Sequence, residues 1–166
     1  RLLRSGKTPS GREVRGQIRR LGRRIRMHWP ATKITIRGDS HYGRHEAMAW
    51  CEANGVDYIF GLGGNDVLDR MVEAAADDVR VRWAEGESPL HPLLRRYAET
   101  RYGAASWKCE RRVAARIESS ANGFDIRYVF TNIRRGSPEW LYDTLYCERG
   151  QAENLIKLHK TQLASD

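Results

Sequence analysis

The feature that most constrains the fold of this chain is an alternation of helical and strand patterns in its first part. Apolar residues at helical spacing over residues 10–29 and 44–54 alternate with short β-branched or aromatic runs at residues 33–37 and 58–60. Consecutive parallel strands need a long crossover connection, which is usually a helix. The order therefore predicts an α/β fold in which helices cover a parallel portion of a sheet.

The first helical pattern is amphipathic. Ser10 and Glu13 form an S-x-x-E capping box at its start, and Pro30 closes it. The apolar positions, which we expect to face the core, are Val14, Ile18, Leu21, Ile25 and Trp29. The other positions carry a series of arginines: Arg12, Arg15, Arg19, Arg20, Arg23, Arg24 and Arg26.

Basic charge is concentrated at the start of the chain. The net charge is +8, but residues 1–37 hold twelve Lys and Arg and one acid, whereas the remainder holds seventeen basic and twenty acidic residues. A concentrated positive surface favours a polyanion such as nucleic acid, because binding releases counterions. A solubilising helix face has the same composition, so charge alone leaves both interpretations open.

The sequence argues against several classes of protein. No apolar run approaches the roughly 20 residues that a membrane span needs, and no signal-peptide pattern is present. The cysteines Cys51, Cys109 and Cys147 lie far apart without a C-x-x-C pair. This arrangement predicts reduced thiols in a cytosolic protein and argues against a zinc site or a disulfide framework.

Beyond residue 61 the pattern changes. Residues 67–76 predict one further helix, and a helical pattern resumes at residues 138–145. Between them lie strand-like runs at residues 79–83, 95–102, 111–118 and 127–131. This series predicts a strand-rich, antiparallel insertion.

Asp39 directly follows the first predicted strand, within the sequence Gly38-Asp39-Ser40. A carboxylate just past the C-terminal end of a strand lies where open α/β sheets place their chemistry. The alternative is an Asp that caps the next helix or tightens the turn. Taken alone, Asp39 fits both interpretations.

The stretch of residues 145–166 predicts a helix with one charged stripe. At about 100° per residue, one narrow face of this helix carries a phenol, a carboxylate and three cations. These residues are Tyr146, Arg149, Glu153, Lys157 and Lys160. A solvated face with i,i+4 ion pairs is the alternative interpretation.

The spacing Tyr146-x2-Arg149-x3-Glu153-x6-Lys160 matches the Y-R-E-K signature of DDE transposases encoded by bacterial insertion sequences. Three further segments follow the order seen in the DDE group 1 type: G-D-S-x-Y, M-A-W-C-E-A-N-G-V-D-Y-I-F-G-L, and S-W-x-x-x-R-R-V at residues 106–113. The chain therefore resembles this family over nearly its whole length.

The resemblance implies an α/β fold with a ribonuclease-H-like core and a β-rich insertion between the second and third acidic residues. It divides the chain into three parts. Residues 1–61 form a partial core with the basic helix and the Asp39 strand, residues 62–137 form the insertion, and residues 138–166 form the C-terminal core helices with the Y-R-E-K motif.

The resemblance also implies a chemistry. Asp39 and Glu153 become the second and third acidic residues, and together they bind a pair of Mg²⁺ ions, with Mn²⁺ as the alternative. Two such ions about 3.5–4 Å apart activate the attacking oxygen and neutralise the departing one. Water then frees a 3′-hydroxyl at the transposon end, and that hydroxyl attacks target DNA.

The resemblance implies a DNA-binding role, separate from metal binding, for the cations beside Glu153. Arg149 and Lys160 hold phosphates of the transposon end, Tyr146 donates its hydroxyl to the same backbone, and Lys157 joins them. The implied partners are the terminal inverted repeats and target DNA, bound by a homodimer. The implied location is the bacterial cytoplasm, at the nucleoid when the protein is bound to DNA.

One departure from the family concerns the first acidic residue. The family needs a first Asp on the opening strand of the core, and the sole acid before Asp39 is Glu13, within the capping box. We therefore expect a truncated transposase that lacks its opening strands and has little activity alone. The alternative function is a non-catalytic, basic nucleic-acid-binding remnant that uses the arginine-rich helix.

Two other groups of residues have competing interpretations. His41 and His45 lie four positions apart just after Asp39 and could form a transition-metal site with it. Histidines of turns and surfaces are, however, commoner than metal-binding histidines. Trp107 and Trp140 could stack on a displaced base, although burial in the core is favoured. Packing roles are expected for Trp29, Trp50 and Trp83.

Overall fold

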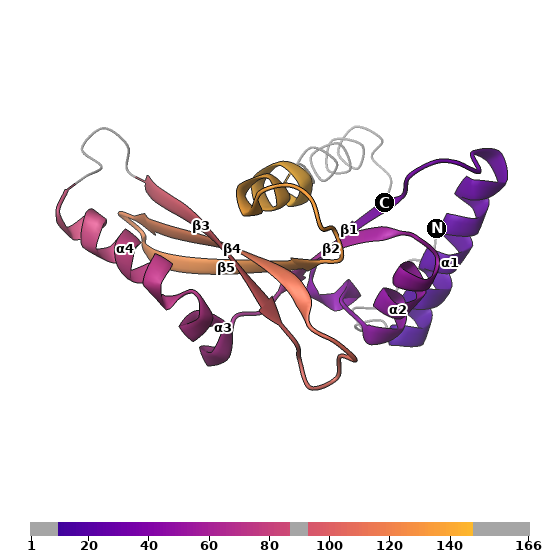
Figure 1. Ribbon diagram of the computed structural model, residues 1–166, viewed down its shortest axis with the longest axis horizontal. Coiled ribbons are helices and arrows are strands. Elements are labelled where there is room, and N and C mark those ends of the chain that lie inside the picture. Colours follow the sequence, from indigo (N-terminus) through magenta and orange to yellow (C-terminus); the bar gives the residue numbers. More distant parts are fainter. Residues whose placement is uncertain (1–9, 87–92, 148–166) are drawn as a thin grey trace, which may run out of the picture.

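A mixed five-stranded sheet forms the centre of the protein (Figure 1). The structure is a computed structural model, and it describes residues 10–86 and 93–147. The strand order is β1-β2-β5-β4-β3. The strands are β1 (Thr35–Gly38), β2 (Asp57–Leu62), β3 (Leu93–Tyr102), β4 (Arg111–Ser120) and β5 (Gly123–Thr131). β1 and β2 are parallel and the other pairs are antiparallel, so the predicted α/β class with a parallel portion is confirmed.

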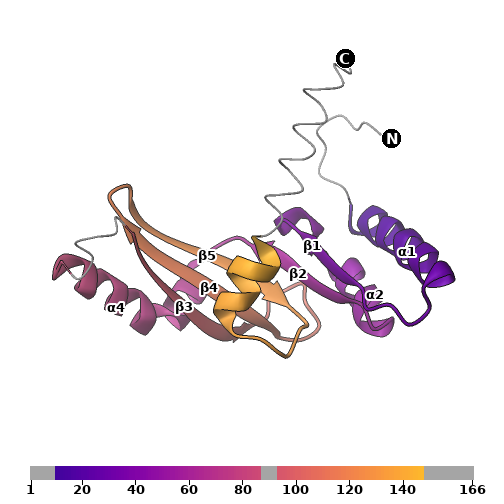
Figure 2. The same cartoon turned by 90° about the horizontal axis from the view of Figure 1, so that it is seen from above.

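Helices cover both faces of this sheet. One face packs against α1 (Gly11–His28), α2 (His45–Ala53), α3 (Asp66–Met71) and α4 (Glu73–Ala84), and the other packs against the π-helix η2 (Trp140–Tyr146). Side chains alternate between the two faces, as they must in a strand. In β2, Tyr58 and Phe60 lie on the face covered by α1–α4, and Ile59 lies on the face covered by η2. Figure 2 shows η2 lying across the middle of the sheet.

The start and end of α1 follow the sequence prediction. The Ser10 hydroxyl accepts a hydrogen bond from the Glu13 backbone N–H at 3.4 Å, and the Glu13 carboxylate accepts one from the Ser10 N–H at 2.9 Å. The helix ends at His28, two residues before Pro30. α2 likewise ends before Gly55, whose φ of 59° is left-handed and therefore suits glycine.

The buried face of α1 differs from the predicted one. Leu21 and Trp29 are 64% and 63% exposed, so the prediction that both pack inward is wrong. Gly22 is buried instead, because Trp50 of α2 packs directly on it: a β-carbon there would stand 2.8 Å from the Trp50 ring. The helix turns its glycine, rather than the neighbouring leucine, toward α2.

The middle of the chain contains more helix than the sequence predicted. Residues 79–83 belong to α4, so the strand predicted there is wrong. Ala76 and Val79 are three positions apart and both are buried, whereas Val81 is 53% exposed, which is helical spacing. The single helix predicted over residues 67–76 is split at Val72 into α3 and α4. The predicted strands that correspond to β3, β4 and β5 are confirmed.

The strands β3–β5 extend the same sheet as β1 and β2, because β5 pairs directly with β2. Within the part of the chain that the structure describes, no helix has the length and apolar character needed to cross a membrane.

Candidate functional site

Asp39 lies just beyond the C-terminal end of β1, where it caps the short 3-10 helix η1 (Ser40–Tyr42). Its Oδ1 accepts a hydrogen bond from the His41 backbone N–H at 2.9 Å and lies 3.3 Å from Nδ1 of the same histidine. The side chain is 46% exposed, and no contact within the described residues uses Oδ2. The half-exposed carboxylate therefore tightens the turn through Oδ1, and Oδ2 makes no hydrogen bond or ion pair in the described part of the chain.

Gly61 of β2 brings three elements together beside Asp39. It follows Ile59 on the η2 face of the sheet, next to the end of β1. A β-carbon on Gly61 would stand 2.7 Å from the Tyr146 hydroxyl, 3.3 Å from the Ser40 nitrogen and 3.6 Å from the Asp39 α-carbon. The end of η2 and the Asp39 turn thus meet over a position that has no side chain.

Arg37 links the same two elements directly. Its Nη1 donates a hydrogen bond to the backbone carbonyl of Leu145 at 2.8 Å, across 108 positions of sequence. Arg37 lies in β1, two residues before Asp39, and Leu145 immediately precedes Tyr146. The contact joins the strand that presents Asp39 to the end of the helix that presents Tyr146.

The face of η2 that lies on the sheet is anchored by apolar and ionic contacts. Leu141 and Tyr142 are buried, and the Arg116 guanidinium stacks over the Tyr142 ring at 4.7 Å. Asp143 accepts a hydrogen bond from the Tyr97 hydroxyl and pairs with Arg95 at 3.0 Å. Burial and this hydrogen bond to Asp143 raise the pKa of Tyr97 to about 12, so Tyr97 remains a donor at neutral pH.

Of the predicted site residues, the structure brings together Asp39 and Tyr146. The other predicted site residues, Arg149, Glu153, Lys157 and Lys160, lie outside the described residues.

The two histidines near Asp39 do not add a metal site in the described part of the chain. His41 faces Asp39, but His45 points its Nδ1 toward Glu46 at 3.6 Å. Within residues 10–86 and 93–147, no group of three or more His, Cys, Asp or Glu side chains lies close enough to hold an ion.

Trp107, between β3 and β4, and Trp140 of η2 both contact the core. Trp107 lies 4.6 Å from Phe130 between ring centroids and 5.2 Å from the Arg111 guanidinium, and Trp140 packs with the cluster under η2. Trp50 also packs on the core, as predicted, and Trp83 is half-buried in α4.

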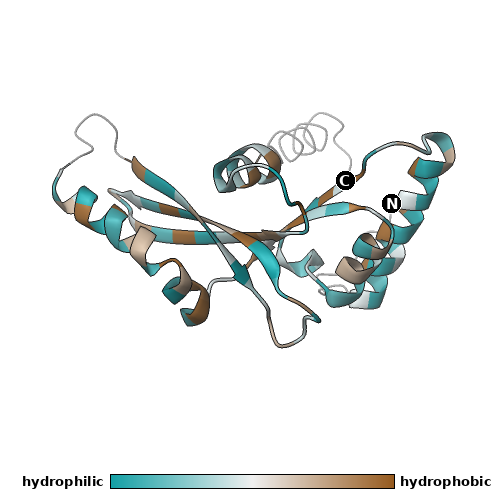
Figure 3. Cartoon of the chain, in the orientation of Figure 1, coloured by the Kyte–Doolittle hydropathy of each residue, from teal (hydrophilic) through white to brown (hydrophobic). Residues whose placement is uncertain are grey.

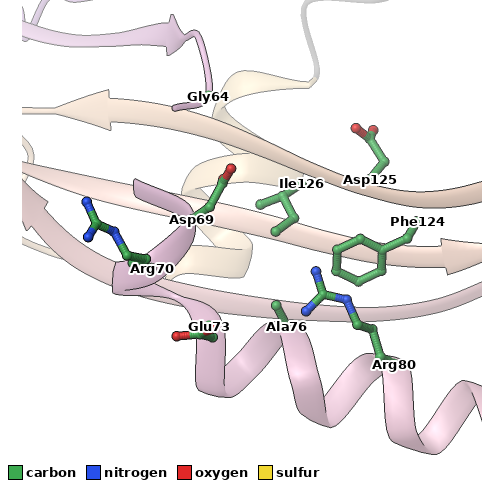
Figure 4. A pocket seen from close by; sticks show the side chains of 9 residues that line it. All are labelled: Gly64, Asp69, Arg70, Glu73, Ala76, Arg80, Phe124, Asp125 and Ile126. Atoms are coloured by element: carbon green, nitrogen blue, oxygen red, sulfur yellow. The ribbon is translucent and has the colours of Figure 1, made fainter. Parts of the chain in front are cut away.

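A separate pocket of about 380 Å³ lies between α3, α4 and β5 (Figure 4). Two of its polar side chains are engaged with neighbours: Asp69 accepts a hydrogen bond from the Tyr128 hydroxyl at 2.6 Å, and Arg80 stacks on Phe124 at 4.2 Å and pairs with Asp77. Burial and the bond to Asp69 raise the pKa of Tyr128. This pocket contains none of the predicted site residues.

Three residues that position the site have no signal in the sequence. Arg37 and Gly61 are described above, and Arg112 of β4 holds the loop before η2 by donating to the carbonyls of Ile133, Arg135 and Gly136. The S-W-x-x-x-R-R-V segment contains Arg112, but nothing in its pattern predicts this contact.

In a comparison with protein families, the model of the transposase DDE domain group 1 matches residues 1–166. The chain belongs to this family. No curated protein and no solved structure matches this transposase domain. Membership assigns the domain to an enzyme class that carries out DNA transposition, acts on DNA and generally uses divalent metal ions.

Proposed function

We propose that Asp39 and Glu153 are the second and third acidic residues of a DDE active site that cuts insertion-sequence ends and joins them to target DNA. The observation that carries the proposal is the meeting of Tyr146 and the Asp39 turn over Gly61. Tyr146 opens the Y-R-E-K spacing, and Glu153 follows it by about two turns in the helix that the sequence predicts. The charged stripe of this predicted helix begins at Tyr146, and Tyr146 lies beside the Asp39 turn.

We assign β1, α2 and β2 to a ribonuclease-H-like core, in which α2 is the crossover between two parallel strands. Residues 62–137 are then an insertion that starts with α3 and α4 and extends the core sheet with β3–β5. Residues 138–166 are then assigned to the C-terminal part of the core, which begins with η2. This assignment accounts for the contact of η2 with β1 through Arg37.

Asp39 fits a role as a metal ligand. Mg²⁺ prefers hard oxygen ligands and keeps part of its water, and Asp39 offers a half-exposed carboxylate at the edge of the sheet. Asp39 and Glu153 would hold the Mg²⁺ pair, with Mn²⁺ as the alternative. When bound, such ions make the attacking oxygen more nucleophilic and neutralise the departing oxygen.

Four further side chains would hold the DNA. Arg149 and Lys160 bind phosphates as a planar fork and as a point charge, Lys157 adds a third cation, and Tyr146 donates its hydroxyl to the backbone. Contacts of this kind position the duplex and carry little sequence information. We propose that the substrates are terminal inverted repeats and target DNA, bound by a homodimer in the bacterial cytoplasm.

Glu13 does not complete the acidic set. Its carboxylate accepts the hydrogen bond of the capping box, and α1 belongs to the face of the sheet opposite η2. With two of three acidic residues proposed, we expect little cutting by the chain alone. The test therefore uses the chain by itself and, in parallel, the chain joined to any coding sequence found upstream of it in its gene.

The test measures Mg²⁺-dependent cutting of a labelled duplex that carries the inverted repeat flanking the gene. Asp39→Asn is the informative substitution, because asparagine keeps the turn-capping hydrogen bond and removes the charge. We expect Asp39→Asn and Glu153→Gln to abolish cutting and to leave DNA binding largely intact. Glu139→Gln, an exposed carboxylate just before η2, is the matched control and should cut normally. Normal cutting by Glu153→Gln would overturn the assignment.

The arginines exposed on α1 favour a second candidate, a non-catalytic nucleic-acid-binding protein. This candidate predicts DNA binding without Mg²⁺-dependent cutting, even after the upstream segment is joined. Cutting that depends on Asp39 excludes it.

A further inference from the structure

The outer face of α1 carries an unusual density of unpaired positive charge. Arg26 is excluded from this set, because it donates a hydrogen bond to the carbonyl of Gly55 at 3.2 Å. None of the remaining arginines forms an ion pair within residues 10–86 and 93–147, and all are exposed. These six arginines, called here the α1 arginine face, are Arg12, Arg15, Arg19, Arg20, Arg23 and Arg24. The hydrophilic colour along α1 in Figure 3 includes this face.

Gly16 lies within the α1 arginine face and packs against no other element that the structure describes. A glycine inside a helix costs about 1 kcal/mol relative to alanine. At Gly22 the contact with Trp50 explains this cost, but, apart from neighbouring atoms of α1 itself, a β-carbon on Gly16 would meet no atom of residues 10–86 or 93–147 within 4 Å. A groove of about 330 Å³ follows this part of the helix, and it is lined by Gly16, Arg19, Arg20, Arg23, Arg24 and Met27. The missing side chain lets another molecule approach the helix closely.

We propose that the α1 arginine face binds the sugar–phosphate backbone of duplex DNA. The face extends about 18 Å from Arg12 to Arg24, at 1.5 Å per residue. Duplex DNA presents about ten phosphate charges over the same length, at one per roughly 1.7 Å. Guanidinium groups bind phosphate oxygens in a bidentate fork, so the face matches this ligand in both charge and chemistry.

An anionic membrane is a less suitable partner. A helix that binds a membrane surface inserts an apolar face between the lipids. The apolar face of α1 is already buried through Val14 and Ile18 against the core. Exposed apolar residues such as Met27 lie among or beside the arginines and form no continuous second face.

The α1 arginine face is separate from the candidate active site. α1 packs on the same face of the sheet as α2, α3 and α4, and Tyr146 packs with the η2 cluster on the opposite face. DNA bound by α1 is therefore held at a place other than the Asp39 turn, through its backbone and without regard to sequence. The inference rests on the family's use of DNA but not on the assignment of Asp39 and Glu153.

The test measures the affinity of the chain for a labelled duplex of arbitrary sequence, without an inverted repeat, across a series of salt concentrations. The test variant is Arg12→Gln, Arg19→Gln and Arg23→Gln combined. The charge-matched control combines Arg80→Gln, Arg101→Gln and Arg127→Gln, arginines that pair with Asp77, Glu110 and Asp125. We expect the test variant to lower affinity for all sequences and to reduce the salt slope by about three. The control should retain the original slope.

Gly16→Leu provides a second variant that does not threaten the fold. Leucine favours the helix and has open space at this position, so the melting temperature should stay the same or rise while duplex affinity falls. An unchanged slope in the arginine variant, or an equal loss in the control, overturns the proposal. Binding to phosphatidylserine vesicles without binding to the duplex also overturns it.

The active-site variants separate this inference from the proposed function. Loss of cutting by Asp39→Asn reports on the proposed catalytic site, whereas loss of affinity for the arbitrary duplex in the arginine variant reports on the α1 arginine face. Normal cutting by Asp39→Asn together with weak binding by the arginine variant would reject the proposed catalytic site and support the α1 arginine face.

Discussion

The hydroxyl oxygen of Tyr146 lies 2.7 Å from the point where a β-carbon on Gly61 would stand. The same point is 3.6 Å from the α-carbon of Asp39. The end of η2 can therefore approach the Asp39 turn because the intervening strand position has no side chain. Gly61 sets the separation between the first residue of the Y-R-E-K spacing and the proposed metal ligand.

Gly61→Ala should reduce Mg²⁺-dependent cutting and leave the protein folded. The added methyl group overlaps the tip of a side chain that can move, so the sheet is retained while Tyr146 is displaced. A misplacement of about 1 Å can cost roughly 100-fold in rate. Cutting rates and thermal unfolding measure the two effects. Gly63→Ala is the matched control, since a β-carbon there meets nothing within 4 Å, and equal rates for the two variants would contradict the prediction.

Arg37→Ala should weaken the link between β1 and η2 with a small effect on stability. Arg37 is exposed and loses one hydrogen bond, to the carbonyl of Leu145, which is worth about 1 kcal/mol. If the contact positions Asp39 relative to Glu153, the Mg²⁺ concentration for half-maximal cutting should rise.

Arg44→Ala is the control for this prediction. It removes the same charge near Asp39, but within the described residues the Arg44 guanidinium donates its hydrogen bond to the carbonyl of His41, in its own loop. An equal rise in the Mg²⁺ requirement of both variants would mean that charge, rather than the β1–η2 contact, is responsible.

The local elements of the fold could be predicted where short-range chemistry decides them. The capping box fixes the start of α1, and the position of Asp39 follows from the end of a strand. Residues 79–83 were predicted wrongly because a short β-branched run fits a helix as well as a strand, and burial against the sheet decides between them. The buried face of α1 depends on Trp50, which lies on a different helix.

The candidate site could be predicted in part. Asp39 and Tyr146 were identified separately, from a strand end and from a spacing. Their approach depends on Gly61 and Arg37, which act across more than 80 positions of sequence and leave no periodic pattern. Neither residue differs locally from other glycines and arginines of the chain, so the structure was needed to find them.

The three cysteines should differ sharply in reactivity toward an alkylating reagent. Cys51 is fully buried, and burial, with a smaller effect of the charge of Glu52, raises its pKa to about 12. The thiolate is the reactive form, so at pH 8 Cys51 should stay unmodified in the folded protein. Cys109 and Cys147 are exposed and should react. Cys147 should react more slowly than Cys109, because partial burial of its thiol raises the pKa of Cys147. Mass spectrometry of labelled peptides tests this, and rapid labelling of Cys51 before unfolding would contradict the packing of α2.

Arg112→Lys should destabilise the protein although it keeps the charge. The Arg112 guanidinium forms a fork with Glu99, at 2.8 and 2.6 Å, and donates to three carbonyls of the loop that leads into η2. An ammonium group cannot reproduce this planar set of contacts. Since the side chain is 13% exposed, the lost bonds leave partly buried acceptors, and we expect about 1–3 kcal/mol lower stability in urea unfolding.

Arg101→Lys is the control for Arg112→Lys. Arg101 faces Arg112 across the β3–β4 pair, but its side chain is 68% exposed and lies 3.8 Å from Glu110, so its substitution should change stability by less than about 0.5 kcal/mol. Because the Arg112 contacts fix the loop before η2, Arg112→Lys should also cut DNA more slowly at temperatures where it is fully folded. Equal stability and equal cutting rates for the two variants would show that Arg112 does not position η2.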